Sequence, residues 1–232
     1  MKAVASAQDV QRLFDTGAHF AHVKARRHPS MKPYLIGTKG RSEIIDLAKT
    51  EDQIVIAKRV MEALARDGKT VLFVGGKTEV STLVKEAAKT AGQPYVATRW
   101  LGGTISNFPE IKKRIDRLAS LQEERAAGTL AKRHTKLELV YLGREEKRLV
   151  ERLDGITGLA KRPDALLVVD TKREKHAVKE ARDAGIPVIG IMSSDCNLKD
   201  AVYPIVANDA SREAVKLILK ELAEAFVKGR TV

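Results

Sequence analysis

Two short stretches of the chain carry residue types that could bind a nucleotide. Residues 70–78 read TVLFVGGKT, an apolar run followed by Gly-Gly-Lys-Thr, and residues 166–170 read LLVVD, an apolar run that ends in aspartate. In nucleotide hydrolases a glycine-rich loop cradles the phosphates, its lysine reaches the outer phosphates, and a strand-end aspartate serves the metal ion. The two stretches therefore raise the hypothesis of a phosphate site.

The spacing argues against that hypothesis. A phosphate loop needs a glycine, four residues, and then Gly-Lys-Ser/Thr, because the intervening backbone must curl around the phosphates. The residue five positions before Gly76 is Val71, which lies inside the apolar run. Gly75-Gly76 is more simply a tight turn after a strand, and an aspartate at a strand end, such as Asp170, commonly caps the next turn. A nucleotide or sugar-phosphate site of a different kind at the strand ends remains an alternative, since open parallel sheets bind ligands there.

Other reactive side chains form no recognisable site. His19, His22 and His28 lie close in sequence, but no paired cysteines or carboxylate-rich cluster accompany them, as a metal site with matched ligands would require. The one cysteine, Cys196, excludes an internal disulfide, fits a reducing compartment and has no obvious base beside it. The sequence therefore predicts no catalytic residue, no cofactor and no metal site.

The elements around these motifs alternate between strands and helices. Apolar strands are expected near residues 44–47, 70–74, 95–98, 165–169, 186–192 and 204–207, and helices near residues 51–66, 78–90, 174–184 and 211–228. Strands that are apolar throughout indicate a parallel sheet covered on both faces. The pattern predicts an α/β fold with a mostly parallel sheet.

This alternation stops between residues 108 and 156. Two sets of spaced apolar residues stand there without a strand between them, separated by a turn at residues 126–129. The simplest interpretation is a protruding antiparallel helical hairpin. We therefore expect an α/β domain formed by residues 1–105 and 158–232, and a hairpin formed by residues 106–157.

The charge balance is strongly basic. Among 232 residues, 42 are Lys or Arg and 30 are Asp or Glu, which gives a net charge of +12. Residues 16–42, here called the cationic segment, contain no acidic residue but several prolines and glycines. We expect much of this segment to be irregular, to contribute nothing to the core, and to follow a phosphate backbone. A solvated basic loop is the alternative.

Several blocks together resemble one family, the bacterial form of ribosomal small-subunit protein number two. They read GAHFAH at residues 17–22, RRHPSMKPY at 26–34, IIDLAKT at 44–50, RWLGGTISNF at 99–108, PDALLVVD at 163–170 and IPV at 186–188. The chain departs from the family pattern at Ala21, at His28, and in the loops at residues 193–197 and 207–210. The resemblance covers nearly the whole chain, and its blocks recur in order.

The resemblance implies a doubly wound, mostly parallel, flavodoxin-like α/β fold with a protruding helical pair. It also implies a structural component of the small ribosomal subunit and not an enzyme. It implies contact with small-subunit rRNA and with neighbouring ribosomal proteins, including the large one that gathers mRNA, and a cytoplasmic location without a membrane. An enzyme that binds a nucleotide or phosphate ligand at the strand ends is the alternative function. The predicted RNA contacts are Lys24, Arg26, Arg27, Lys32, Lys39, Arg41, Arg99, Asn107, Lys112 and Lys113.

Overall fold

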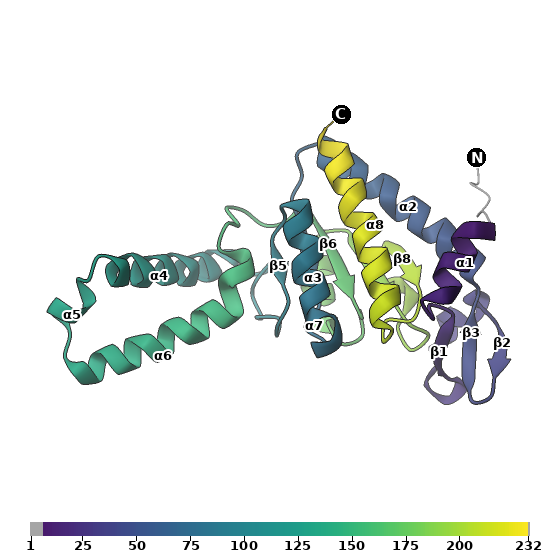
Figure 1. Ribbon diagram of the computed structural model, residues 1–232, viewed down its shortest axis with the longest axis horizontal. Helices are drawn as coiled ribbons and strands as arrows, with labels where there is room; N and C mark the ends of the chain where they lie inside the picture. The colour runs from purple at the N-terminus through teal and green to yellow at the C-terminus, as the bar shows by residue number, and fades with distance from the viewer. Residues whose placement is uncertain (1–6, 232) are drawn as a thin grey trace.

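A computed structural model describes residues 7–231 of the protein, without the side chains of residues 131 and 132 (Figure 1). The strands are β1 (Phe20–Val23), β2 (Leu35–Lys39), β3 (Ser42–Ile45), β4 (Val71–Val74), β5 (Tyr95–Val96), β6 (Ala165–Val169), β7 (Val188–Met192) and β8 (Tyr203–Val206). The helices are α1 (Ala7–Asp15), α2 (Leu47–Arg66), α3 (Thr78–Ala91), α4 (Phe108–Ala126), α5 (Leu130–Arg133), α6 (Lys136–Leu153), α7 (Lys175–Asp183) and α8 (Arg212–Arg230).

Five of the strands form a parallel sheet in the order β5-β4-β6-β7-β8. The chain enters at β4, moves outward to β5, and then crosses β4 to continue through β6, β7 and β8 in sequence. This is the strand order of flavodoxin-like doubly wound folds, and it places a switch in winding direction between β4 and β6. The expected α/β fold with a parallel sheet is confirmed.

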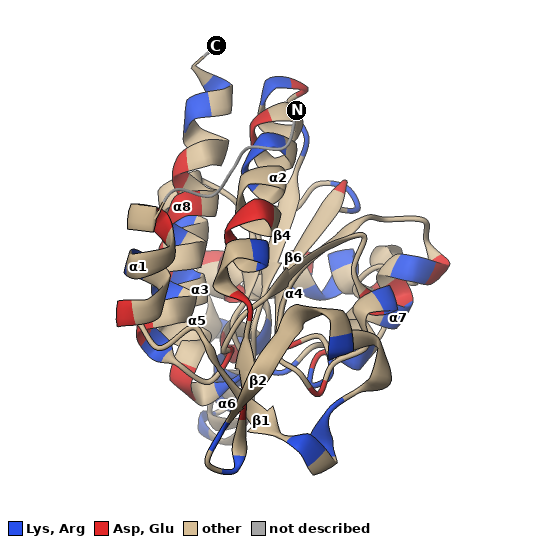
Figure 2. Ribbon diagram, turned by 90° about the vertical axis from the view of Figure 1, so that its right-hand side faces the viewer, with Lys and Arg blue, Asp and Glu red and all other residues tan. Residues whose placement is uncertain are grey.

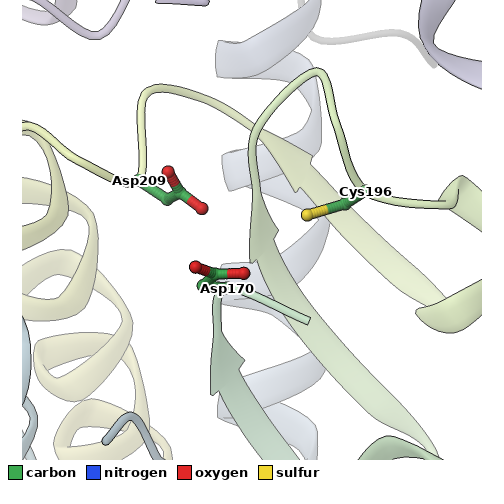
Figure 3. Close-up of side chains that lie close together, drawn as sticks. All are labelled: Asp170, Cys196 and Asp209. Atoms are coloured by element: carbon green, nitrogen blue, oxygen red, sulfur yellow. The ribbon is translucent and has the colours of Figure 1, made fainter. Parts of the chain in front are cut away.

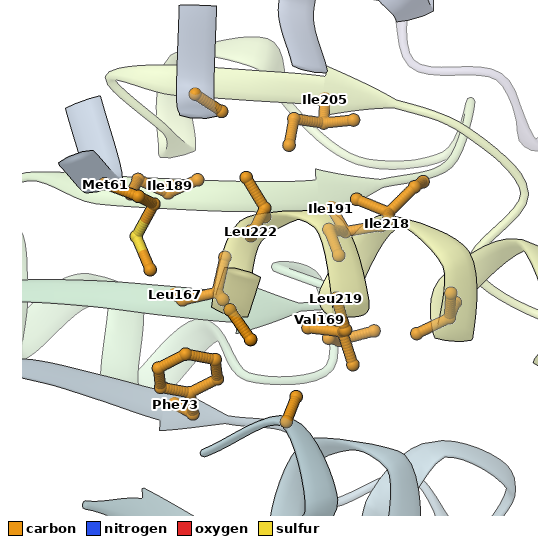
Figure 4. Packing of buried hydrophobic residues seen from close by; sticks show 14 of the residues in the cluster. Met61, Phe73, Leu167, Val169, Ile189, Ile191, Ile205, Ile218, Leu219 and Leu222 are labelled. Atoms are coloured by element: carbon orange, nitrogen blue, oxygen red, sulfur yellow. The ribbon is translucent and has the colours of Figure 1, made fainter. Parts of the chain in front are cut away.

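Each face of this sheet has its own hydrophobic cluster, because successive residues of a strand point to opposite faces. On one face Phe73, Leu167 and Ile189 pack in a cluster with residues of α2, α3 and α8 (Figure 4). On the other face Leu72 and Leu166 belong to a cluster with residues of α7, α4 and the end of α6. Covering both faces buries every residue of β4, β6 and β7, which explains their continuous apolar sequences.

Two long helices, α4 and α6, project from the sheet at the end of the molecule away from α1 (Figure 1). A short helix, α5, connects them, where the sequence predicted only a turn. Two charged pairs link the helices near the middle of α6: Arg117 lies 3.4 Å from Glu145, and Arg125 lies 2.6 Å from Glu146. Within the described residues, no helix combines the length and the apolar character needed to cross a membrane.

The expectation that the cationic segment is mostly irregular is wrong. Residues 16–42 contain β1, β2, the start of β3 and two 3-10 turns, Lys24–Arg26 and Pro29–Tyr34. Met31 is fully buried, and with Ala21 it joins the same hydrophobic cluster as Leu72 and Leu166. The segment therefore contributes to the core, because a few small or apolar side chains between its prolines and glycines are enough to dock it on the domain.

Candidate nucleic-acid interface

The cationic segment forms most of a three-stranded antiparallel sheet in the order β1-β3-β2. Lys39 pairs with Ser42 in the register of β2 and β3, so Gly40 and Arg41 make the two-residue turn between these strands. Gly40 has φ of +64°, a left-handed conformation that glycine adopts without a steric cost. The turn holds both Lys39 and Arg41 out in solvent.

Hydrogen bonds attach the cationic segment to the loops that follow β7 and β8. The backbone N–H of His28 donates to the carbonyl oxygen of Ser194 at 2.8 Å, and the N–H of His22 donates to the Ser194 hydroxyl at 3.1 Å. The N–H of Asn208 donates to the carbonyl oxygen of Ala18 at 3.0 Å. The segment thus covers the carboxyl ends of two parallel strands, the edge at which doubly wound sheets usually bind ligands.

Five predicted contacts in this segment are exposed cations, and none of them forms an ion pair with a described carboxylate. They are Lys24, Arg26, Lys32, Lys39 and Arg41. Figure 2 views the molecule from the side of the antiparallel sheet, with Lys and Arg in blue. The only acidic residue in the three strands is Glu43 of β3, so the positive charge of this surface is largely uncompensated. Such a surface attracts polyanions.

Arg27 differs from its neighbours. Its Nη1 lies 2.7 Å from Oε1 of Glu43, a side chain that is only 2% exposed. A buried carboxylate is costly without a counter-ion, and Arg27 supplies that counter-ion. The structure therefore gives Arg27 a structural role, whereas the adjacent Arg26 remains exposed and unpaired among the described residues.

The turn at Gly76, where the sequence raised the hypothesis of a phosphate site, already has its backbone donors paired within the protein. The N–H of Gly76 donates to Oε1 of Glu174 at 3.0 Å, so a backbone donor suited to a phosphate already holds a carboxylate. Any Cβ at residue 76 would collide with the carbonyl oxygen of Thr98. The glycine therefore allows two backbone segments to approach closely, as the tight-turn interpretation requires.

Lys77 likewise forms ion pairs with acidic side chains. Its Nζ lies 3.8 Å from Oδ2 of Asp170 and 3.6 Å from Oδ1 of Asp209. Asp170 has φ of +64° and accepts a hydrogen bond from the N–H of Arg173 at 3.0 Å, which is the capping role expected from the sequence. With two aspartates beside it, this lysine cannot present a net positive charge to a phosphate.

Asp170, Cys196 and Asp209 point toward a common space at the ends of β6, β7 and β8 (Figure 3). One donor atom from each lies within 4.8 Å of the others, an arrangement of oxygen and sulfur that could hold a cation. Burial, with the nearby charge of Asp170, raises the pKa of Asp209 to about 7. Burial also raises the pKa of the Cys196 thiol to about 12, so the thiol is protonated at neutral pH.

The three clustered histidines do not come together as ligands. The ring of His19 stacks on Phe14 at 4.3 Å between centroids and lies 4.1 Å from the ring of Phe20. Burial and the charge of Lys39 lower the pKa of His19, which favours the neutral ring. His22 lies 3.6 Å from Asp195, while His28 pairs with Ser30 at 2.7 Å.

The loop at residues 97–107 is organised by one carboxylate, Glu180 of α7. Glu180 accepts hydrogen bonds from the Trp100 indole at 3.1 Å and from the backbone N–H groups of Gly103 at 2.8 Å, Ile105 at 3.0 Å and Ser106 at 3.1 Å. Burial alone would raise the pKa of Glu180, but these donors outweigh it and lower the pKa. No pattern in the sequence points to this role, because Glu180 stands 80 positions from Trp100.

The remaining predicted contacts lie on or beside this loop. Arg99 is exposed and lines a cavity of about 720 Å³ together with Arg173 and Lys179. Asn107 is exposed at the start of α4, where its side chain makes no capping hydrogen bond. The last two predicted contacts are compensated within α4: Lys112 pairs with Asp116 at 3.1 Å, and Lys113 pairs with Glu110 at 2.6 Å.

Comparison with known proteins identifies one family. The family profile described as Ribosomal protein S2 matches residues 13–229. The small ribosomal subunit protein uS2 of Dictyoglomus thermophilum is 40% identical over 221 residues, which is 95% of this chain and 89% of that protein. The protein of the same name from Wolinella succinogenes is 40% identical over 220 residues, which is 95% of this chain and 81% of that protein. The matched region includes both sheets and the projecting helices.

Proposed function

The chain belongs to the ribosomal protein S2 family, and we propose that it is a structural constituent of the small ribosomal subunit that binds rRNA and neighbouring ribosomal proteins during translation. A protein in this role is a structural component and not an enzyme. The observation that carries the RNA contact is the set of five exposed cations on the cationic segment that form no ion pair within residues 7–231. These cations lie on two 3-10 turns, on β2 and on the turn that follows it, all parts of a folded segment and not of a loose arm.

The fixed placement of this surface favours RNA as its partner. Phosphate groups repeat along an RNA strand, and protein cations that neutralise them release counter-ions. The turn at Gly40 and the hydrogen bonds to Ser194 hold the cations in place before binding. Less conformational entropy is then lost when RNA binds than with a disordered segment.

The identity of individual partners follows from the family resemblance. We propose that the large ribosomal protein that gathers mRNA docks on this chain, and that the ribosome containing it works in the cytoplasm. We also propose that the boundaries of the projecting unit lie at residues 106 and 157.

A salt series tests the RNA contact. The variant carries alanine at Lys24, Arg26, Lys32 and Lys39, all exposed and without a described ion pair. Each phosphate contact contributes roughly 0.7 to the slope of log affinity against log salt for single-stranded RNA, so the slope should fall by about 3. The measurement is binding to full-length small-subunit rRNA, together with co-sedimentation with small subunits.

A matched control removes four cations from another part of the surface. Arg59, Arg66, Lys89 and Lys216 are exposed, form no ion pair within the described part of the chain, and lie on α2, α3 and α8. Their replacement by alanine should leave the slope nearly unchanged. An unchanged slope in the first variant would reject the cationic segment as an RNA contact, and failure of the wild-type chain to enter the small-subunit pellet at any salt would reject the ribosomal role.

The alternative of a nucleotide-binding enzyme finds no support at the strand ends. Carboxylates occupy both the Gly76 N–H and the Lys77 ammonium group. Calorimetric titration with ATP and Mg²⁺ should therefore show no tight stoichiometric binding. Magnesium-dependent binding at one nucleotide per chain would favour the enzyme.

A further inference from the structure

Three arginines converge on a cavity where the projecting helices leave the sheet domain. The cavity has a volume of about 240 Å³ and is lined by Arg114 of α4 and by Arg148 and Arg152 of α6. Arg148 and Arg152 are four positions apart on one helix, so their side chains lie on the same face. We infer that this cavity binds phosphate groups of an RNA strand, a site separate from the cationic segment.

The charges around the cavity are not balanced. Arg114, Arg148 and Arg152 are exposed, and none of them pairs with a carboxylate of the described residues. The Nε of Arg148 donates to the carbonyl oxygen of Arg144 at 3.2 Å, which leaves both of its terminal nitrogens free for a ligand. The three guanidinium groups that line this small space therefore have no ion-pair partner among the described residues.

Most of the acidic residues nearby already pair with other cations. Glu145 is the one carboxylate among the described residues that line the cavity, and its Oε1 lies 3.4 Å from Nε of Arg117. Further along the helices, Asp116 pairs with Lys112 and Glu146 pairs with Arg125. Even with the exposed Glu151 of α6, which adjoins Arg152 in the sequence, the three arginines keep an excess of positive charge.

An RNA strand fits this arrangement better than an acidic protein segment. Arginine presents a planar fork of donors that matches the oxygens of a phosphate, and several arginines together suit a ligand with repeated phosphates. The half-buried side chains of Leu101 and Leu149 also line the cavity and offer apolar contact for a ribose or base. Arg99, an RNA contact predicted from the sequence, belongs to the same loop as Leu101 and would add a further positive charge beside the three arginines.

The test replaces the three arginines by glutamine in the full-length chain: Arg114→Gln, Arg148→Gln and Arg152→Gln. The probe is full-length small-subunit rRNA, because this inference rests on the proposed ribosomal function. Loss of three phosphate contacts should reduce the salt slope by about 2. Replacement of the same residues by lysine should retain most of the slope and still weaken binding, because lysine keeps the charge and loses the two-pronged geometry.

The control variant carries Arg59→Gln, Arg66→Gln and Lys89→Gln, which remove the same total charge from α2 and α3. It should bind rRNA with nearly the wild-type slope. Equal slopes for the wild type and the arginine-cavity variant would overturn this inference while leaving the ribosomal role intact, since the wild-type chain would still bind rRNA. Loss of a neighbouring protein from the subunit at unchanged rRNA affinity would overturn it in favour of an acidic protein partner.

Discussion

Nη1 of Arg27 lies 2.7 Å from Oε1 of the buried Glu43, and this ion pair ties β3 to the end of the 3-10 turn Lys24–Arg26. Two consecutive arginines of the cationic segment thus have different tasks. Arg27 compensates a carboxylate inside the protein, while Arg26 points to solvent. Stability measurements and RNA-binding measurements should separate the two.

Replacement of Arg27 by alanine should lower the free energy of unfolding by about 2 kcal/mol, because it leaves a buried carboxylate without its counter-ion. The expected loss is smaller than the roughly 3 to 5 kcal/mol typical of fully buried pairs, since Arg27 is partly exposed. Replacement of Arg26 by alanine should change that free energy by less than about 0.5 kcal/mol, as is typical for exposed positions. Urea titration gives both values. The double variant Arg27→Ala, Glu43→Gln should regain part of the loss, and a double variant as unstable as the single one would contradict this explanation.

Replacement of Glu180 by glutamine should lower the free energy of unfolding by about 2 kcal/mol, because glutamine offers one uncharged acceptor to a set of donors that surround a carboxylate. Asp183, an exposed residue that ends the same helix, provides the control, since Asp183→Asn removes an equal charge. Chemical denaturation at pH 7 measures both. A Glu180→Gln variant as stable as the control would show that the carboxylate does not hold the loop.

The same residue predicts how acid affects stability. The pKa of Glu180 is lower in the folded protein than its ordinary value of 4.5, so the folded state holds this proton less tightly than the unfolded state does. Its contribution to stability is fully present above about pH 4.5 and is lost as the pH falls through the folded pKa. Unfolding measured between pH 6 and pH 3 should therefore show a steeper loss in the wild type than in Glu180→Gln. Parallel curves would contradict the direction of the shift.

Replacement of Gly76 by alanine should destabilise the protein by at least about 2 kcal/mol, because the added Cβ meets the backbone of Thr98 and the packed segments must separate. Gly37 offers a matched control, since a Cβ there meets nothing within 4 Å. Thermal unfolding of both variants measures the difference. Equal midpoint temperatures of unfolding for the two variants would mean that the close backbone approach at Gly76 does not contribute to stability.

Cys196 should not react with thiol reagents in the native protein at pH 8. Its pKa of about 12 leaves almost no thiolate, and the side chain is buried. In urea the thiol becomes exposed, its pKa returns toward the ordinary value, and one equivalent of a disulfide reagent should react quickly. Rapid stoichiometric labelling without denaturant would contradict the burial of this residue.

Much of the parallel sheet was predictable from the sequence. The continuous apolar runs at β4, β6 and β7 reflect burial on both faces, a local pattern that needs no knowledge of partners. Each expected helix of the domain overlaps one in the structure. Helix and strand ends differ by a few residues, as the start of α2 at Leu47 illustrates.

The cationic segment and the loop at residues 97–107 show why the rest was not predictable. Met31 is buried in a segment that attaches to residues more than 160 positions away, such as the Ser30–Leu198 hydrogen bond. In the sequence Glu180 looks like an ordinary surface residue of an amphipathic helix. Only the fold brings the hydrogen-bond donors of the loop, such as the Trp100 indole and the Gly103 N–H, to its carboxylate. Among the cations, the sequence could not separate Arg27, whose acidic partner Glu43 lies 16 positions away on another element, from Lys39, which has no acidic partner among the described residues.

The attachment of the N-terminal sheet to Ser194 and Asn208 has a consequence for how this domain could be re-engineered. The chain itself covers the ends of β7 and β8, an edge where related architectures hold a ligand. Removing that closure would uncover Asp209, which is 1% exposed, and the neighbouring thiol to water. A designer seeking a ligand pocket in this scaffold would have to begin by cutting away the surface that we propose faces the ribosome.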